Sequence, residues 1–180
     1  MEKTWLLGTA LALALGTLAP ASAAENVLVR FQGGIGSTPV RGGTIANNAP
    51  LPNDVFTIQA GGRPWVIRKL EAKVKINGDI EVNGKGLIVA GGNSVGRPGT
   101  KAGVPITSVF ASLFCNGDPT PLNTVAVPLA ANGDFTIKDT FAPLPPNPCA
   151  APVLLIRDPD PLNVVWFAAG VPASTNDDDD

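Results

Sequence analysis

The presence of two cysteines and the absence of histidine limit the chemistry that this chain can perform. The 180 residues contain no histidine and no tyrosine, and the single methionine is Met1. A Ser-His-Asp triad and metal sites built on imidazole therefore lack an essential group. Cys115 and Cys149 are the two cysteines. Because an even number leaves no thiol over, we expect one disulfide between them in a chain that reaches an oxidising compartment.

Carboxylates are the next groups that could support hydrolysis. A glycosidase needs only two of them, about 5–9 Å apart. The candidates are Glu71, Asp79, Glu81 and Asp134. The first three alternate with apolar residues and fall opposite lysines, an arrangement typical of a solvated strand. We therefore expect no catalytic residue among them, and a carboxylate-based hydrolase is kept as an alternative.

A second catalytic alternative is a nucleophile pair, Ser94 with Lys101. A lysine can activate a serine for acyl transfer only where other groups also stabilise the oxyanion, and no such arrangement is evident in the sequence around either residue. The glycine-rich run 91–96 also lacks the lysine of a phosphate-binding loop. We expect ordinary loops here, with no cofactor bound.

Trp65 and Trp166 each lie in an apolar stretch that predicts a strand. A tryptophan at the surface can stack on a sugar ring, whereas a tryptophan in a β-sandwich more often fills the core. We expect core positions for both residues. Exposure of either indole would favour the alternative of a carbohydrate-binding module.

Acidic clusters raise the question of a metal site. Asn-Gly-Asp occurs three times, beginning at Asn77, Asn116 and Asn132. Calcium prefers such oxygens, but none of the three runs carries the further carboxylates of a calcium loop. We therefore expect turns, because asparagine and glycine tolerate positive φ. The run Asp177–Asp180 predicts a flexible acidic tail over residues 173–180, with a weak divalent-cation site as the alternative.

Short β-like runs separated by turn residues recur along the chain. This pattern is typical of an antiparallel sandwich or barrel, and the 38 glycines and prolines leave few windows for a long helix. The expected strands are Val27–Gln32, Val55–Ala60, Trp65–Ile76, Ile80–Ala90, Ile106–Cys115, Thr124–Leu129, Asp134–Lys138, Val153–Arg157 and Val164–Ala169.

The clearest hairpin covers residues 69–83. A two-residue loop would pair Val74 with Glu81 and put an apolar residue and a charge on one face. A three-residue loop, 76–78, gives Gly78 the left-handed position and pairs Val74 with Ile80 and Lys73 with Glu81. We expect this second register, because it leaves one face apolar and the other charged.

The first 24 residues have the pattern of a secretory signal peptide. Glu2 and Lys3 precede an apolar run, 5–18, that is too short to span a bilayer comfortably. Pro20 and a stretch of small residues follow, and cleavage is expected after Ala23 or Ala24. The alternative is an uncleaved membrane anchor. This segment predicts a secreted or periplasmic protein.

The stretch 104–156 carries a resemblance to known modules. A Phe-rich strand at 110–115, the run Val125–Leu129 and the Asn132-Gly133-Asp134-Phe135 hairpin are similar to prealbumin-like β-sandwich modules of the carboxypeptidase regulatory-like and Cna-B types. The residues of Cna-B isopeptide chemistry cannot be placed here, so that activity is not carried over. Further features run along the mature chain: a Phe-x-Gly-Gly-Ile-Gly start at 31–36, a lysine-rich strand, a Gly-x-Gly-Leu-x-x-Ala-Gly-Gly-Asn loop at 84–93 and a Pro-Pro-Asn-Pro-Cys segment at 145–149 that leads into 152–157. With these features the chain resembles uncharacterised secreted bacterial proteins, which imply no activity.

Together these observations predict an all-β fold: a single antiparallel β-sandwich over residues 25–172, immunoglobulin-like or prealbumin-like, with one disulfide. The expected function is a non-enzymatic structural or binding role outside the cytoplasm. One alternative is a subunit of an extracellular assembly, formed by pairing of the strand Val27–Gln32 with a neighbouring molecule; another is a carbohydrate- or ion-binding module. The small net charge of −2 argues against nucleic acid, and the partner stays open between a protein and a glycan.

Overall fold

The computed structural model describes residues 26–41, 51–101, 103–161 and 164–173. Within these ranges the chain forms strands and no helix. The described residues therefore contain no helix that could cross a membrane. The expected signal segment 1–24 and the tail from residue 174 lie outside the described residues. The strands are β1 (Val27–Gly36), β2 (Val40–Arg41), β3 (Leu51–Pro52), β4 (Asp54–Val55), β5 (Ile58–Gln59), β6 (Trp65–Val66), β7 (Lys69–Lys75), β8 (Asp79–Lys85), β9 (Ile88–Val89), β10 (Thr100–Lys101), β11 (Val104–Pro105), β12 (Ser108–Phe114), β13 (Leu122–Asn123), β14 (Val127–Pro128), β15 (Phe135–Thr140), β16 (Val153–Arg157) and β17 (Trp166–Pro172).

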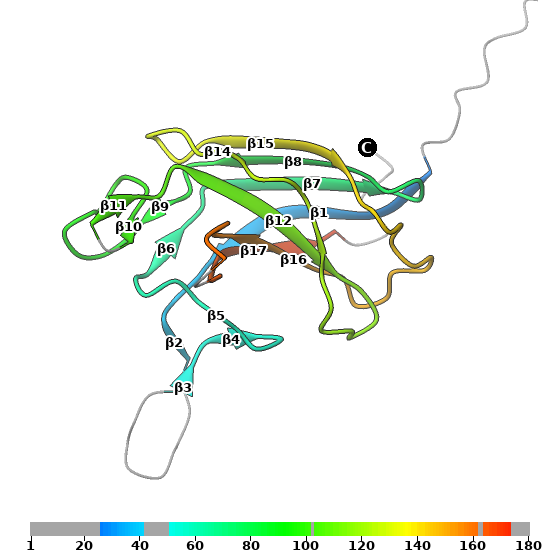
Figure 1. Cartoon of the computed structure of the whole chain (residues 1–180), viewed down its shortest axis with the longest axis horizontal. Coiled ribbons are helices and arrows are strands. Elements are labelled where there is room, and N and C mark those ends of the chain that lie inside the picture. The colour runs from blue at the N-terminus through cyan, green and yellow to red at the C-terminus, as the bar shows by residue number, and fades with distance from the viewer. Residues whose placement is uncertain (1–25, 42–50, 102, 162–163, 174–180) are drawn as a thin grey trace, which may run out of the picture.

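One antiparallel sheet of nine strands dominates the molecule (Figure 1). Its strand order is β13-β12-β16-β17-β1-β7-β8-β15, and β14 pairs with β12 next to β13. The sheet curves as a half-barrel around the main core. The predicted all-β antiparallel fold is therefore confirmed. A sandwich of two stacked sheets is not confirmed, because the strands expected in two layers belong to one continuous sheet.

The β7–β8 hairpin has the register expected from its alternating sequence. Val74 lies opposite Ile80 and Lys73 opposite Glu81, and Gly78 has a φ of 87°. The apolar side chains of both strands enter the core, while the charged ones face solvent. The turn prediction for the three Asn-Gly-Asp runs is also confirmed, since the glycine in each has a positive φ.

Strand β1 lies in the middle of the sheet and joins its two halves. Residues Val27–Gln32 pair with β7, and Phe31–Gly36 pair with β17. The pairing of β1 with β17 is interrupted by a β-bulge between Phe31 and Gly34, where Gly33 has a φ of 95°. An assembly through Val27–Gln32 would have to compete with these partners in the same chain.

A second, smaller core covers the outer face of β12, β16 and β17. Strand β16 alternates strictly, so that Leu154 and Ile156 enter the main core while Leu155 faces outward. The β4–β5 hairpin folds over that outward face (Figure 1). Phe56 stacks on Phe114 with ring centroids 4.8 Å apart. The prediction of one continuous strand over Val55–Ala60 is therefore wrong. This segment forms the β4–β5 hairpin, because it packs over the outer surface of the sheet.

The expected strands 65–76 and 80–90 are each interrupted at one point. Beyond β7 and β8 the two segments pair again as β6 and β9, with Trp65 opposite Val89. Between the two ladders Gly86 has a φ of 64°. A Cβ at this position would collide with the Arg68 side chain. The break turns the β6–β9 end away from the sheet, toward β10 and β11 (Figure 1).

The disulfide between Cys115 and Cys149 is present, as predicted from the sequence. The two cysteines are 34 residues apart in sequence and tie the end of β12 to the segment that leads into β16. The enclosed chain includes β13, β14 and β15. Two further hydrogen bonds, between Asn116 and Ala150, lie next to the crosslink: the Asn116 N–H donates over 2.6 Å and the Ala150 N–H over 2.7 Å.

Replacing both cysteines, as in C115A/C149A, is expected to lower the free energy of unfolding by about 3–4 kcal/mol, since the unfolded chain regains the entropy of a long closed loop. Urea unfolding followed by tryptophan fluorescence measures this change. The unsubstituted chain in dithiothreitol is the control and should lose a similar amount. An unfolding midpoint unchanged in both samples would show that the crosslink contributes nothing.

Candidate functional site

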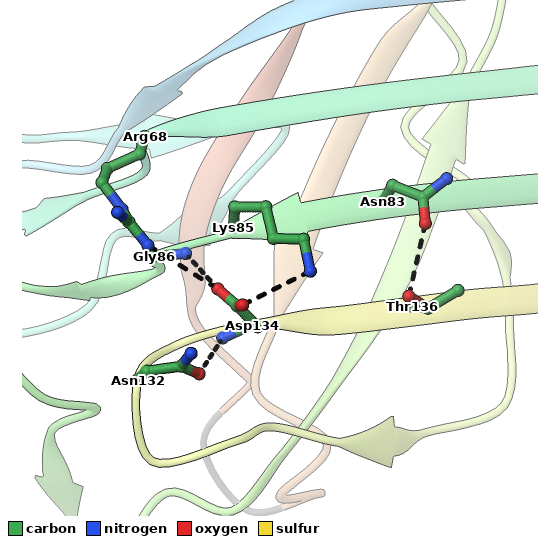
Figure 2. A network of polar contacts seen from close by, with 7 residues as sticks. All are labelled: Arg68, Asn83, Lys85, Gly86, Asn132, Asp134 and Thr136. Carbon is green, nitrogen blue, oxygen red and sulfur yellow. Dashed lines mark hydrogen bonds and ion pairs between the residues drawn. The ribbon is translucent and has the colours of Figure 1, made fainter.

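Asp134, one of the expected carboxylates, lies at the break between the two ladders (Figure 2). Its Oδ1 accepts a hydrogen bond of 2.9 Å from the Gly86 N–H, and its Oδ2 lies 3.3 Å from Lys85 Nζ. Arg68 is 3.9 Å away. The Asp134 N–H in turn donates to Asn132 Oδ1 over 3.1 Å. Gly86 lies just beyond the end of β8, where the β-ladder no longer supplies an acceptor for its N–H. The Asp134 carboxylate accepts this hydrogen bond instead.

The remaining candidate carboxylates also have partners on the outer face of the sheet. Glu81 lies 3.0 Å from Lys138, and Glu71 lies 2.8 Å from Lys69. Asp79 accepts hydrogen bonds from Asn77 over 2.9 Å and from Thr140 over 3.0 Å. These side chains are half exposed or more in both ion pairs, so each pair contributes little to stability.

The surroundings of these acids favour the ionised carboxylate. Hydrogen bonds from Asn77 and Thr140 lower the pKa of Asp79. The Lys138 ammonium lowers the pKa of Glu81, and the Gly86 N–H lowers the pKa of Asp134. A glycosidase requires one acid with a raised pKa that donates a proton to the leaving group. The three carboxylates are shifted in the opposite direction.

Ser94 and Lys101 do not form the nucleophile pair considered from the sequence. Ser94 Oγ accepts a hydrogen bond of 2.9 Å from Arg63. Lys101 Nζ instead lies 2.6 Å from Asp160 and 3.4 Å from Asp158. The hydrogen bond to Asp160, followed by the charge of Asp158, raises the pKa of Lys101. The amine is therefore protonated at neutral pH and is no base for Ser94.

Arg63 and Lys101 nevertheless meet at one cavity, which we name the Trp65 pocket. It has a volume of about 240 Å³ and is lined by described residues of three segments, 61–65, 99–106 and 158–167. Its floor is apolar. Trp65 stacks on Phe167 with ring centroids 4.2 Å apart, and both residues belong to the main core. Ile106 and Val165 extend this apolar surface.

Ser37 holds the two aromatic residues of the floor in place. Its N–H donates to the Phe167 carbonyl over 2.8 Å, and its carbonyl accepts from the Trp65 N–H, also over 2.8 Å. Gly36 precedes it, and a Cβ there would collide with the Trp65 backbone. The end of β1 thus fixes the position of both rings.

Glycines form part of the pocket wall and leave the edge of the Trp65 ring uncovered by side chains. A Cβ at Gly61 would lie 2.8 Å from Trp65 Nε1, and a Cβ at Gly99 would lie 3.1 Å from its Cζ2. Neither glycine has a positive φ, so lack of space, not backbone conformation, requires glycine here. Among the described residues, the Trp65 indole N–H has no hydrogen-bond acceptor. The Trp166 indole N–H, in contrast, donates to the Asn53 carbonyl over 3.2 Å.

Both tryptophans are core residues, as expected, with exposures of 4% for Trp65 and 5% for Trp166. Neither ring therefore presents a face to a sugar. Within the described ranges, no three cysteine or acidic side chains lie close enough to hold a metal ion.

Sequence reasoning reached Lys101 and Trp65 but did not bring them together. The sequence pattern assigns no site role to Arg63 or Asp158. The signal that could have helped is the pair of glycine-rich runs on either side of the predicted strands 65–76 and 80–90, since a hairpin brings its two ends together.

Comparisons with protein-family models, with curated proteins and with solved structures found no match to this chain.

Asp134 is expected to make stability depend on acid pH. Its pKa in the folded chain is below the ordinary value of 3.8, so the unfolded chain binds more protons as the pH falls through this region. The stabilisation is present above pH 4 and is lost as the pH falls through the lower, folded pKa. D134N should therefore be less stable at pH 7 and should lose less stability between pH 4 and pH 2.

Urea unfolding at a series of pH values measures this difference. D54N is the control, because Asp54 is exposed and has no ion pair or side-chain hydrogen bond among the described residues. Equal acid sensitivity of D134N and the unsubstituted chain would contradict the role given to Asp134.

Proposed function

We propose that this chain is an exported, non-enzymatic binding protein that takes a small ligand in the Trp65 pocket. The observation that carries the proposal is the Trp65 indole N–H, which has no acceptor among the described residues and lies at the glycine-lined wall of a cavity of about 240 Å³. The Trp65 residue as a whole is buried, so this N–H is a fixed donor at the cavity wall. A ligand with a hydrogen-bond acceptor can pair with it.

The composition of the pocket supports a binding role. Ligand sites combine an apolar lining with a few polar groups that fix orientation. Here the lining is Trp65, Phe167, Ile106 and Val165, and the polar groups are Arg63, Lys101 and Asp158 at its rim. The volume is that of about eight water molecules in the liquid, which suits a small molecule.

The state of the ionisable groups supports a role without catalysis. Lys101 is held in its charged form, and Asp79, Glu81 and Asp134 lie on a different face and have lowered pKa values. Proton transfer at neutral pH needs a group whose pKa lies near that pH. The pocket contributes fixed charge and hydrogen-bond donors, which suffice for recognition.

Export is proposed from the sequence of residues 1–24, and the Cys115–Cys149 disulfide is compatible with it. When the chain is expressed with its own N-terminus in a bacterial host, N-terminal sequencing of the protein recovered outside the cytoplasm should begin at Ala24 or Glu25. A chain that stays in the membrane fraction and begins at Met1 would contradict export and favour the anchor.

The exported chain would contain two tryptophans, and their indole N–H groups offer a direct test of the pocket. In a ¹⁵N–¹H correlation spectrum the Trp65 indole signal should exchange with solvent faster than the Trp166 signal, whose N–H is bonded to Asn53. A panel of small aromatic and alicyclic molecules, charged and neutral, should include members that shift the Trp65 signal and leave the Trp166 signal in place.

The substitution Gly62→Phe tests the same pocket by covering it. A Cβ at Gly62 meets no atom within 4 Å, so a large side chain can cover the pocket without a clash at its root. It should abolish the shifts. Gly91→Phe is the control outside the pocket, since a Cβ there makes only an ordinary contact of 3.7 Å with Pro64. If no member of the panel shifts the Trp65 signal, or if G62F binds as well as G91F, the proposed function fails.

A further inference from the structure

We infer that the ligand of the Trp65 pocket is a monocarboxylate with a compact apolar body, whose carboxylate is bound by Arg63 and the Trp65 indole N–H. This inference rests on the proposed function and specifies the chemical class of the ligand. It depends on how charge is distributed around the rim.

Arg63 carries the uncompensated positive charge of the pocket. Among the described residues, its guanidinium makes no ion pair and one hydrogen bond, of 2.9 Å to Ser94 Oγ. An arginine has five N–H donors in a planar fork that matches a carboxylate. The bond to Ser94 fixes the direction of this half-buried side chain and leaves the other donors for a ligand.

Lys101 also lines the pocket, and its charge is already compensated. Asp158 and Asp160 lie 3.4 and 2.6 Å from its Nζ. Asp158 is itself nearly buried and held by neighbours, because its N–H donates to Val165 and its Oδ1 accepts from the Asp160 N–H. A ligand anion is therefore attracted to the Arg63 side and repelled from the side of the two aspartates.

The indole N–H adds a second donor to the pocket that Arg63 lines. Trp65 Nε1 lies beside Gly61, two residues before Arg63 in the same wall. One cation and one neutral donor match a single negative charge better than the double charge of a phosphate monoester. The edge of the Trp65 ring, together with Ile106 and Val165, then contacts the apolar part of the ligand.

Phenylacetate, phenylacetamide and phenyl phosphate form a suitable set of probes, because they share a ring and differ in the polar group. Isothermal titration of the exported chain at pH 7 and low salt should rank phenylacetate above the other two. In Arg63→Gln the Kd of phenylacetate should rise about tenfold or more, as expected for one charge-assisted hydrogen bond. The same variant should lose most of the preference over phenylacetamide, and added salt should weaken binding in the unsubstituted chain.

Arg68→Gln is the control, since Arg68 is 70% exposed and lies outside the pocket. It should leave the Kd of phenylacetate unchanged. Equal binding of phenylacetate and phenylacetamide, with no effect of R63Q, would overturn the carboxylate class while the binding function stands. Tighter binding of phenyl phosphate would overturn it in favour of a phosphate ligand. Absence of binding by all three, with the Trp65 signal still shifted by other molecules, would also overturn this class alone.

Discussion

The fold depends on β1 being hydrogen bonded along both of its edges. β7 and β8 form a local hairpin, whereas β12, β16 and β17 come from the C-terminal half of the chain. Only β1 connects these two groups within the main sheet. Pairing between segments that are distant in sequence costs loop entropy, and the pairings of β1 with β7 and with β17 are both of this kind. The bulge at 31–34 shifts the register of its pairing with β17, and a bulge of this kind bends the strand and increases its local twist.

The position of β1 also determines where the pocket can form. Immediately after this strand, Ser37 bonds to the backbone of Trp65 and of Phe167. The aromatic floor is therefore an extension of the sheet, fixed by backbone hydrogen bonds. The rim, in contrast, comes from loops and from the short strand β10 at the end of the molecule (Figure 1). A rigid sheet thus supports polar loops, an arrangement that is common in binding proteins.

Much of the fold was predictable because alternation and turn residues are local signals. The register of 69–83 follows from which residues must be buried, and the boundaries of Val153–Arg157 match its apolar run. The continuous sheet was not predictable, since strand order is set by contacts between distant segments. The pocket was missed for the same reason: Arg63, Gly99 and Asp158 are far apart in sequence and meet only in the folded chain. The disulfide was predictable because two cysteines allow one pairing.

The two parts of the pocket are subject to unequal constraints. Trp65 and Phe167 also belong to the main core, so a change of either residue would be felt by the whole sheet. Arg63 bonds through its side chain to Ser94, outside the main sheet, and a Cβ at Gly62 would meet no atom within 4 Å. Under the proposed binding function, substitutions at the rim residues alone could change which molecule is recognised. Homologous chains would then share the aromatic pair Trp65 and Phe167 and differ in the ligand that they prefer.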